Sequence, residues 1–238
     1  LPFVNGLEVL KELREQKDKN ELGVIMMTSA NENVSGAVFL KNGANDFIAK
    51  PFLKEELICR VNNTIENMEN INKIANFANK DFLTGLFNRR YFYDDMQGYL
   101  ASLEENPMPY AVAVIDVDGL KNINDKYGQD SGDKILKLLA KKLIDDTKSS
   151  DIAARFGGGE FCILLKNVSQ EDAVKFFVGL RAAIAANPIN MKNEPVKISV
   201  SIGVTFGKSD YNADEILELA DEALYKAKQN GRNRVEIA

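Results

Sequence analysis

The sequence predicts an α/β protein in which a short parallel-sheet segment precedes a larger domain with a central antiparallel sheet flanked by helices. Strand and helix patterns alternate through residues 1–56, which is typical of a parallel sheet. Residues 57–79 contain neither Gly nor Pro, which favours one long helix. Within residues 80–238, two apolar segments flank a glycine triplet, which indicates a β-hairpin. A chain of 238 residues can form two ordinary domains, each with its own core.

The first 56 residues are predicted to alternate between helix and strand. Leucines recur on one side of the first helix, and the first strand is short and fully apolar. The predicted order is helix 5–15, strand 23–27, helix 34–41 and strand 44–48.

A polar side chain follows each of these strands, Thr28 after the first and Lys50 after the second. Because the carboxyl ends of parallel strands share one edge of the sheet, a hydroxyl and an ammonium group would meet there, as a phosphate pocket requires. The alternative is an ordinary strand-end hydroxyl and a solvated lysine.

A seven-residue repeat of apolar side chains runs along the helix predicted for residues 53–79. A polar Asn within such a stripe favours a defined register in a two-stranded coiled coil, and therefore a homodimer. The alternative is one long helix that packs on its own domain. The stripe consists of Ile58, Ile65 and Asn72 at one heptad position and Val61, Met68 and Ala75 at the other.

The sequence RFGGGEF at residues 155–161 lies between two strand-like segments and is predicted to form a hairpin tip. Gly157 and Gly158 can adopt positive φ and let the backbone approach a bulky polyanion closely. The carboxylate of Glu160 can hold a divalent cation. Taken alone, the triplet would be an ordinary glycine turn.

Further motifs surround this hairpin. They are DFLTGLFNRR at 81–90, DVD at 116–118 after an apolar strand, KNIND at 121–125, GQDSGD at 128–133 and ALYKAKQNGRN at 223–233. With these motifs in this order, residues 80–238 closely resemble the GGDEF domains of diguanylate cyclases, which condense two GTP into cyclic di-GMP. The resemblance implies a nucleotidyl-cyclase-like fold, a GTP substrate and a cyclic di-GMP product.

The resemblance also implies a metal site at the end of the strand that precedes DVD. Asp116, the Val117 carbonyl and Glu160 would hold Mg²⁺ (or Mn²⁺) on the α-phosphate, and the catalytic positions would be Asp116, Gly159 and Glu160. The alternative reading of Asp116 is an ordinary Asp that ends a strand.

Asn124 and Asp133 are the candidates for reading the base. A carboxylate accepts hydrogen bonds from N1–H and the amine of guanine, whereas adenine offers an unprotonated N1, so Asp133 would select guanine. The alternatives are a loop Asn and an Asp that stabilises a helix N-terminus.

Lys228 and Arg232 are spaced by one helical turn, which predicts that both lean over one triphosphate from a helix end. In isolation they would be solvated basic residues. The substrate-binding set is completed by Lys121, Gly157 and Gly158.

Gly159 departs from the family pattern, in which an Asp or Glu at this position is the second carboxylate on the metals. Its loss removes about half of the negative charge that holds magnesium, and cation affinity depends strongly on ligand charge. We therefore expect nucleotide binding to survive and turnover to be low or absent. The alternatives are a catalytically silent module that binds GTP or cyclic di-GMP, a slow enzyme, and a variant engineered to trap a state.

A second departure concerns product inhibition. Many family members carry Arg-x-x-Asp upstream of the hairpin as an inhibitory site, and here the aligned ends are Lys148 and Asp151. Lysine offers only a point charge where arginine grips a guanine edge with two donors, so we expect weak inhibition. A solvated Lys and a strand-leading Asp are the favoured reading.

Residues 1–56 resemble the second half of a response-regulator receiver domain. The resemblance makes Thr28 the phosphate-contacting hydroxyl, Lys50 the salt-bridging lysine and Lys50–Pro51 a cis peptide. The phospho-accepting Asp and the acidic pair of receivers are not in this sequence, so we expect a fragment of a receiver. An upstream histidine kinase would phosphorylate the complete domain.

Composition agrees with the expected cytoplasmic signalling protein without pointing to it, and it argues against several classes. The net charge of −5 argues against nucleic-acid binding, and the absence of His removes His-based catalysis. No apolar run is long enough to span a membrane. Cys59 and Cys162 are expected to be free, buried thiols in a reducing compartment.

Overall fold

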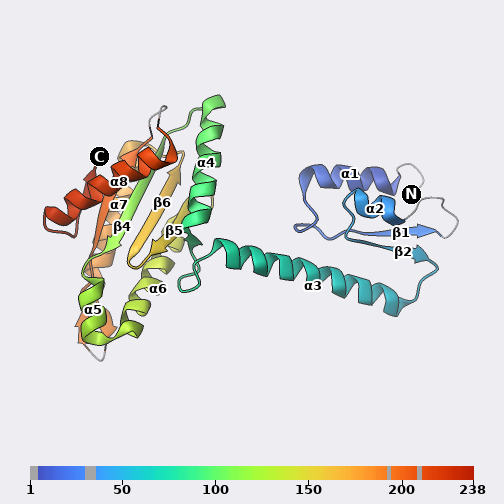
Figure 1. Cartoon of the computed structure of the whole chain (residues 1–238), viewed down its shortest axis with the longest axis horizontal. Helices are drawn as coiled ribbons and strands as arrows, with labels where there is room; N and C mark the ends of the chain where they lie inside the picture. The colour runs from blue at the N-terminus through green and yellow to red at the C-terminus, as the bar shows by residue number, and fades with distance from the viewer. Residues whose placement is uncertain (1–4, 30–35, 192–193, 208–210) are drawn as a thin grey trace. The chain divides into compact units, whose positions relative to one another are not determined.

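The computed structural model of the chain describes residues 5–29, 36–191, 194–207 and 211–238, except for the side chains of residues 72, 75 and 76. The chain divides into two compact units, Leu1–Ala78 and Asn79–Ala238 (Figure 1). Within the described ranges, none of the helices is both long enough and apolar enough to cross a bilayer.

The first unit alternates helix and strand, as the sequence predicts. Asn5 caps the first helix in a reciprocal capping box with Glu8, which fixes where that helix begins. The two strands pair in parallel, and a small core of Leu10, Phe39 and Ala44 lies against them. The elements are α1 (Gly6–Gln16), β1 (Ile25–Ser29), α2 (Gly36–Lys41), β2 (Asp46–Lys50) and α3 (Lys54–Asn79). The predicted start of the second helix, at residues 34 and 35, lies outside the described residues.

Two expectations about single residues of this unit have different outcomes. The Lys50–Pro51 peptide is cis, as the resemblance implied. The prediction that both thiols are buried is wrong for Cys59, which is exposed on α3, whereas Cys162 is buried in the second unit. Only one side of α3 is buried, and Cys59 lies on the exposed side.

One side of α3 packs on the other elements of the first unit. Arg60 forms an ion pair with Asp46 at 2.9 Å, and the Thr64 and Met68 side chains lie beside Gly23. Met68, which the heptad pattern assigns to a dimer stripe, is therefore engaged within its own unit.

Other members of the stripe remain exposed on α3. The exposed fractions are 47% for Ile58, 38% for Val61 and 50% for Ile65. The side chains of Asn72 and Ala75 lie outside the described part of the chain. The exposed apolar face is therefore defined by Ile58, Val61 and Ile65.

The second unit is built on a six-stranded sheet in the order β10-β9-β4-β6-β5-β3. The four central strands pair antiparallel, as predicted, and the two edge strands add parallel pairs, β10 with β9 and β3 with β5. The strands are β3 (Phe87–Asn88), β4 (Tyr110–Val117), β5 (Ile152–Gly157), β6 (Glu160–Lys166), β9 (Val200–Phe206) and β10 (Val235–Ile237), and a separate hairpin joins β7 (Ile189–Met191) to β8 (Glu194–Val196).

Helices cover both faces of this sheet (Figure 1). Because side chains alternate along a strand, β4 contributes side chains to the hydrophobic clusters on both faces of the sheet. Ala113 and Ile115 face a cluster with α6 and α7, whereas Val112 and Val114 face a cluster with α4 and α8. This buried central strand carries its last residues to the edge where the functional residues gather. The helices are α4 (Arg89–Glu105), α5 (Leu120–Tyr127), α6 (Gln129–Asp146), α7 (Gln170–Ala186) and α8 (Ala213–Gln229).

Candidate nucleotide and metal site

The glycine triplet forms the tip of the hairpin between β5 and β6, as predicted. Gly157 and Gly158 have φ of 142° and 51°, a region that favours glycine, whereas Gly159 is not left-handed. The Val117 N–H donates a hydrogen bond to the Gly159 carbonyl at 3.1 Å. The hairpin tip is thereby held against the end of β4.

The antiparallel register brings two predicted metal ligands together. Asp116 of β4 is the direct partner of Glu160 of β6, so both side chains lie on one face of the sheet at adjacent positions. Val117, whose carbonyl is the third candidate ligand, follows Asp116 at the end of the strand. The family resemblance had implied this grouping, and the register of β4 with β6 accounts for it.

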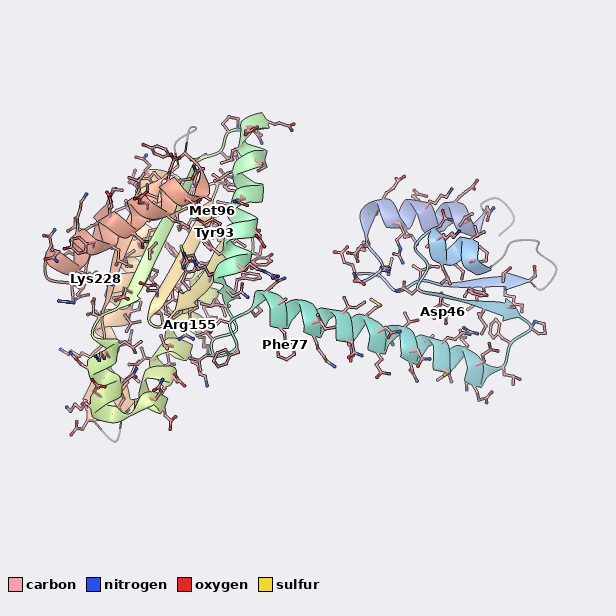
Figure 2. The ribbon with its side chains drawn as sticks, in the orientation of Figure 1. Asp46, Phe77, Tyr93, Met96, Arg155 and Lys228 are labelled. Atoms are coloured by element: carbon pink, nitrogen blue, oxygen red, sulfur yellow. The ribbon has the colours of Figure 1, made fainter. Side chains whose placement is uncertain are left out.

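Asp116 also contacts a predicted phosphate-binding residue. Lys228 lies near the end of α8 (Figure 2). Its Nζ lies 3.2 Å from Asp116 Oδ1, and both side chains are partly buried. Burial raises the pKa of Asp116, and the neighbouring charge of Lys228 opposes that rise. A cation that replaces or joins Lys228 beside this carboxylate would favour its ionised form.

The prediction that Lys228 and Arg232 share a helix end is wrong in its geometry. Lys228 is the penultimate residue of α8, but Arg232 lies beyond the helix in a left-handed conformation, with φ of 62°. The helix stops at Gln229, and Gly231, with φ of 107°, turns the chain back. The turn, rather than helical spacing, places Arg232 near the site.

The two candidate base-reading residues lie on consecutive helices. Asn124 is on α5, and Asp133 is in the first turns of α6. Among the described residues, the Asn124 Oδ1 is buried and has no hydrogen-bond partner. A side chain at Gly132 would overlap this oxygen, so the glycine leaves it room. A buried acceptor without a donor is a group that a ligand amine would satisfy.

Three further candidate residues lie on other segments than Asp116 and Glu160. They are Lys121 and the two residues aligned with the inhibitory motif, Lys148 and Asp151. Lys121 is exposed on α5. Asp151 begins the approach to β5, and its carboxylate accepts hydrogen bonds from the Lys148 N–H at 2.9 Å and the Lys166 N–H at 3.1 Å. Because both Asp151 oxygens are engaged, its position favours a structural role in the turn.

Thr28 and Lys50 lie in the first unit, at the ends of adjacent parallel strands. In the register Thr28 pairs with Ala49 and Ser29 pairs with Lys50, so Thr28 and Lys50 lie one position apart at the carboxyl ends of the two strands. Thr28 is buried and Lys50 is exposed. This is the edge at which the sequence predicted a phosphate pocket.

Sequence reasoning missed the ion pair that fixes the hairpin. Arg155 donates to both oxygens of Asp81, at 3.1 and 3.3 Å, and its Nη2 donates to the Gly158 carbonyl at 2.8 Å (Figure 2). Asp81 also accepts hydrogen bonds from the backbone and hydroxyl of Thr84. Arg155 begins the motif RFGGGEF and Asp81 begins the motif DFLTGLFNRR, but nothing in either motif predicted that these two residues contact each other.

The donors at the end of β4 fit a magnesium ion that binds together with a nucleotide. In the described ranges, no group of three or more His, Cys, Asp or Glu side chains could hold a metal by itself. Mg²⁺, however, is commonly held by one or two carboxylates plus substrate phosphates. Asp116 and Glu160 supply that pair, and the Val117 carbonyl is an oxygen donor of the same kind.

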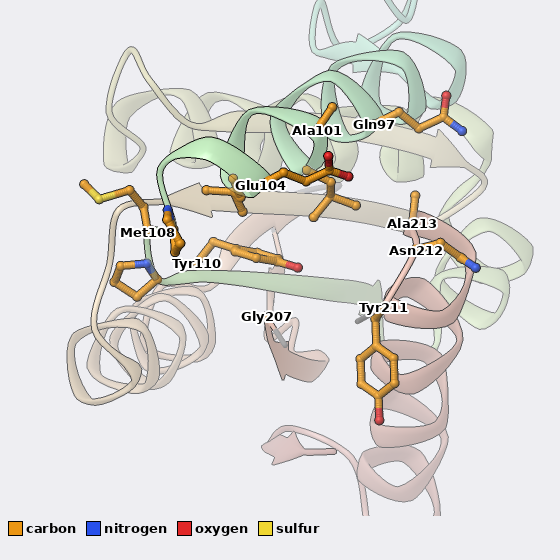
Figure 3. Close-up of a pocket in the computed structure, with 13 residues that line it drawn as sticks. Gln97, Ala101, Glu104, Met108, Tyr110, Gly207, Tyr211, Asn212 and Ala213 are labelled. Carbon is orange, nitrogen blue, oxygen red and sulfur yellow. The ribbon is translucent and has the colours of Figure 1, made fainter. Parts of the chain in front are cut away.

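A cavity of about 760 Å³ lies at the other end of β4, where Tyr110 begins the strand (Figure 3). Leu100, Met108, Gly207 and Tyr211 contribute to its lining. It contains none of the predicted site residues, so this cavity is separate from the carboxylate pair.

Comparisons with known proteins assign both units. A family model described as "Diguanylate cyclase, GGDEF domain" matches residues 78–234, and one described as "Response regulator receiver domain" matches residues 1–62. Response regulator PleD of Caulobacter vibrioides is 30% identical over 242 residues, which cover 97% of this chain and 53% of PleD. Diguanylate cyclase DgcP of Pseudomonas aeruginosa is 40% identical over 158 residues, which cover 66% of this chain and 24% of DgcP. The chain thus spans about half of the length of PleD.

A solved structure agrees with this assignment. The coiled coil and GGDEF domain of DgcB from Caulobacter crescentus, in complex with c-di-GMP, superimposes with a TM-score of 0.71 at 26% identity, covering 78% of this chain and 98% of that chain. The GGDEF match extends over most of the chain, and the chain therefore belongs to the diguanylate cyclase family of GGDEF domains.

Proposed function

We propose that the second unit binds GTP selectively and condenses two GTP into cyclic di-GMP at a rate reduced by Gly159. The observation that carries the proposal is the pairing of Asp116 with Glu160 beside a glycine hairpin tip. Lys228 adds a cation at this edge, 3.2 Å from Asp116. Carboxylates, an open backbone tip and a cation together suit a nucleoside triphosphate with its metal.

Each residue of the site has a distinct role in this proposal. Asp116, Glu160 and the Val117 carbonyl would hold Mg²⁺ or Mn²⁺, which when bound supplies charge stabilisation at the α-phosphate. Gly157 and Gly158 let the phosphates approach the backbone, because no Cβ projects from the tip. Lys121, Lys228 and Arg232 would neutralise phosphate charge.

Guanine selectivity is expected to survive whatever Gly159 does to turnover. The buried, unpartnered Asn124 carbonyl supports the proposal, since it can accept from the guanine amine. The Asp133→Ala variant should bind GTP more weakly by about 1–3 kcal/mol, because a charged hydrogen-bond partner of the base is lost.

Titration calorimetry with GTP and ATP checks this prediction. The parent should bind GTP much more tightly than ATP, and Asp133→Ala should reduce that preference. Asp130→Ala removes a carboxylate from the same helical turn and should leave the preference unchanged. Equal affinity of the parent for GTP and ATP would rule out the assignment of Asp133.

A second candidate function is a silent module that binds GTP or cyclic di-GMP without turning it over. The glycine at position 159 favours it, because the site lacks the carboxylate that the family pattern has at this position. Product formation separates the candidates: any cyclic di-GMP that requires Asp116 supports the enzyme. The Asp151 contacts support weak binding of product at the Lys148–Asp151 turn in either case.

The condensation requires two copies, because each domain supplies one GTP and the two must face each other. We propose a parallel homodimer through α3, supported by the exposed Ile58, Val61 and Ile65. Replacing Ile58 and Ile65 by Glu should produce monomers in analytical ultracentrifugation. Asn67→Glu with Asn70→Glu adds the same charge off the stripe and should leave the parent's assembly state unchanged. If the Ile double variant associates as the parent does, α3 is not the interface.

The first unit would couple this activity to phosphorylation in the complete protein. Thr28 and Lys50, at the carboxyl ends of adjacent parallel strands, support a phosphate pocket. We propose that a histidine kinase supplies the phosphoryl group, and that the protein acts in the cytoplasm, where GTP is available.

A further inference from the structure

The turn after α8 has an unusual backbone. Gly231, Arg232 and Asn233 have φ of 107°, 62° and 48° in succession. Positive φ suits glycine and is tolerated by Asn, but it is uncommon for Arg. Such a conformation persists where surrounding contacts impose it, and it often marks a functional position.

Asp118 provides the first of these contacts. Its two carboxylate oxygens accept hydrogen bonds from the Ser199 and Ser201 hydroxyls, each at 2.7 Å. One of these oxygens also accepts from the Asn233 N–H at 3.1 Å. Asp118 thereby joins the end of β4 to the segment entering β9 and to the left-handed turn. Because both oxygens are engaged, Asp118 is tied to the turn rather than directed to a metal.

Arg181 of α7 provides the second contact, from a different element. Its Nη1 donates to the Asn233 Oδ1 at 3.1 Å and approaches the Asn233 carbonyl at 3.4 Å. Asn233 is thus held by its backbone N–H from one side and by its side chain from the other. Arg232 directly precedes this anchored Asn.

The anchored turn lies beside the proposed phosphate site. The Arg232 N–H donates to the Ala227 carbonyl at 3.0 Å, which ties Arg232 to the last turn of α8, where Lys228 contacts Asp116. A shift of Asn233 would therefore change the position from which the turn presents the Arg232 side chain.

We propose that Asp118 and Arg181 are positioning residues that hold the left-handed turn and thereby aim Arg232 at the nucleotide phosphates. This inference rests on the proposed GTP site. It gives a role in that site to Arg181, which lies on α7 and not on the strands that carry Asp116 and Glu160. Neither residue touches the nucleotide; both act through Arg232.

The test is a double-mutant cycle on GTP affinity, measured by calorimetry with the full chain and Mg²⁺. Arg232→Ala should weaken GTP binding on the order of 10- to 100-fold, as expected for a lost charged contact. Asp118→Ala and Arg181→Ala should each weaken it on the order of 10-fold in the parent and have little effect in the Arg232→Ala background. Lys175→Ala removes an exposed charge from the same helix as Arg181 and should not change the affinity.

The outcomes separate this inference from the proposed function. If Arg232→Ala leaves GTP affinity unchanged, the proposed phosphate site fails and the inference falls with it. If Arg232→Ala weakens binding but the other losses persist in its background, only the positioning role is overturned. Should Asp118→Ala not fold, Arg181→Ala alone decides, because its contacts are exposed and its loss spares the core.

Asp118→Asn distinguishes hydrogen bonding from charge. An amide oxygen placed toward Ser199 and Asn233, with the amide nitrogen donating to the Ser201 hydroxyl, preserves all three contacts. The variant should therefore recover most of the GTP affinity lost in Asp118→Ala. A loss as large as that of Asp118→Ala would show that the negative charge itself is required and would overturn the positioning role.

Discussion

The Gly159→Asp variant is expected to form cyclic di-GMP faster than the parent by orders of magnitude. The substitution adds a carboxylate to a site that already holds Asp116 and Glu160 on paired strands. Metal-held charge on the α-phosphate contributes several kcal/mol to the transition state, and each factor of ten corresponds to about 1.4 kcal/mol.

The local geometry of Gly159 allows this change. Its backbone is not left-handed, so a side chain brings no φ strain. A Cβ there would lie 3.1 Å from Leu120 Cδ2 and 3.5 Å from Val117 Cβ. The closer neighbour is the end of a flexible side chain, which can shift by a few tenths of an ångström.

Three proteins in one assay with GTP and Mg²⁺ make this prediction decisive. Gly159→Ala adds the same Cβ without a carboxylate and should stay as slow as the parent. An increase in Gly159→Asp alone therefore reports the added ligand. Equal rates for the parent and Gly159→Asp would mean that Asp116 and Glu160 suffice, and the impaired-site account would be wrong.

The Arg155→Ala variant is expected to lose about 2–4 kcal/mol of unfolding free energy, because it leaves the Asp81 carboxylate unpaired. The pair is mostly buried, with 10% of the Arg155 side chain and 16% of the Asp81 side chain exposed. Arg155 also donates to the Gly158 carbonyl, so the hairpin tip should loosen and GTP affinity should fall as well. Urea denaturation of the second unit measures the stability change.

Arg155→Lys is the matched control, since it keeps the charge but lacks the planar set of donors that spans Asp81 and Gly158. It should recover only part of the lost stability. If Arg155→Ala is as stable as the parent, the ion pair does not hold the hairpin.

The pH dependence of stability gives an independent check of the same pair. Burial by itself raises the pKa of Asp81, but hydrogen bonds from Thr84 and Arg155 outweigh it and hold the pKa below its usual value. Since the folded-state pKa is the lower one, the ionised carboxylate stabilises the fold above the unfolded pKa of about 3.9. This stabilisation is lost as pH falls below that value, and the loss should be smaller in Arg155→Ala.

The hairpin was predictable because its determinants are local, whereas the grouping of Asp116 with Glu160 was implied by the family resemblance. Gly157 and Gly158 have positive φ at the turn, and the antiparallel register of β4 with β6 pairs Asp116 with Glu160. The parallel pairing of β1 with β2 followed in the same way from alternating helix and strand patterns.

The contacts that the sequence did not predict depend on tertiary packing. Arg155 and Asp81 lie 74 residues apart, and no periodic pattern links them. Helical spacing wrongly placed Arg232 on α8, because the contacts from Asp118 and Arg181 to Asn233 stabilise a left-handed turn that local propensity disfavours. Met68 satisfies the heptad pattern yet packs beside Gly23, since a seven-residue repeat does not specify which surface it covers.

The position of a bound guanine nucleotide tests the account most directly, through a crystal structure with a non-hydrolysable GTP analogue and Mn²⁺. We predict the base beside Asn124 and Asp133, the phosphates between the Gly157–Gly158 tip and Lys228, and an anomalous manganese signal next to Asp116 and Glu160. A nucleotide bound elsewhere, such as in the cavity beside Tyr110, or a base that leaves Asp133 uncontacted, would contradict it.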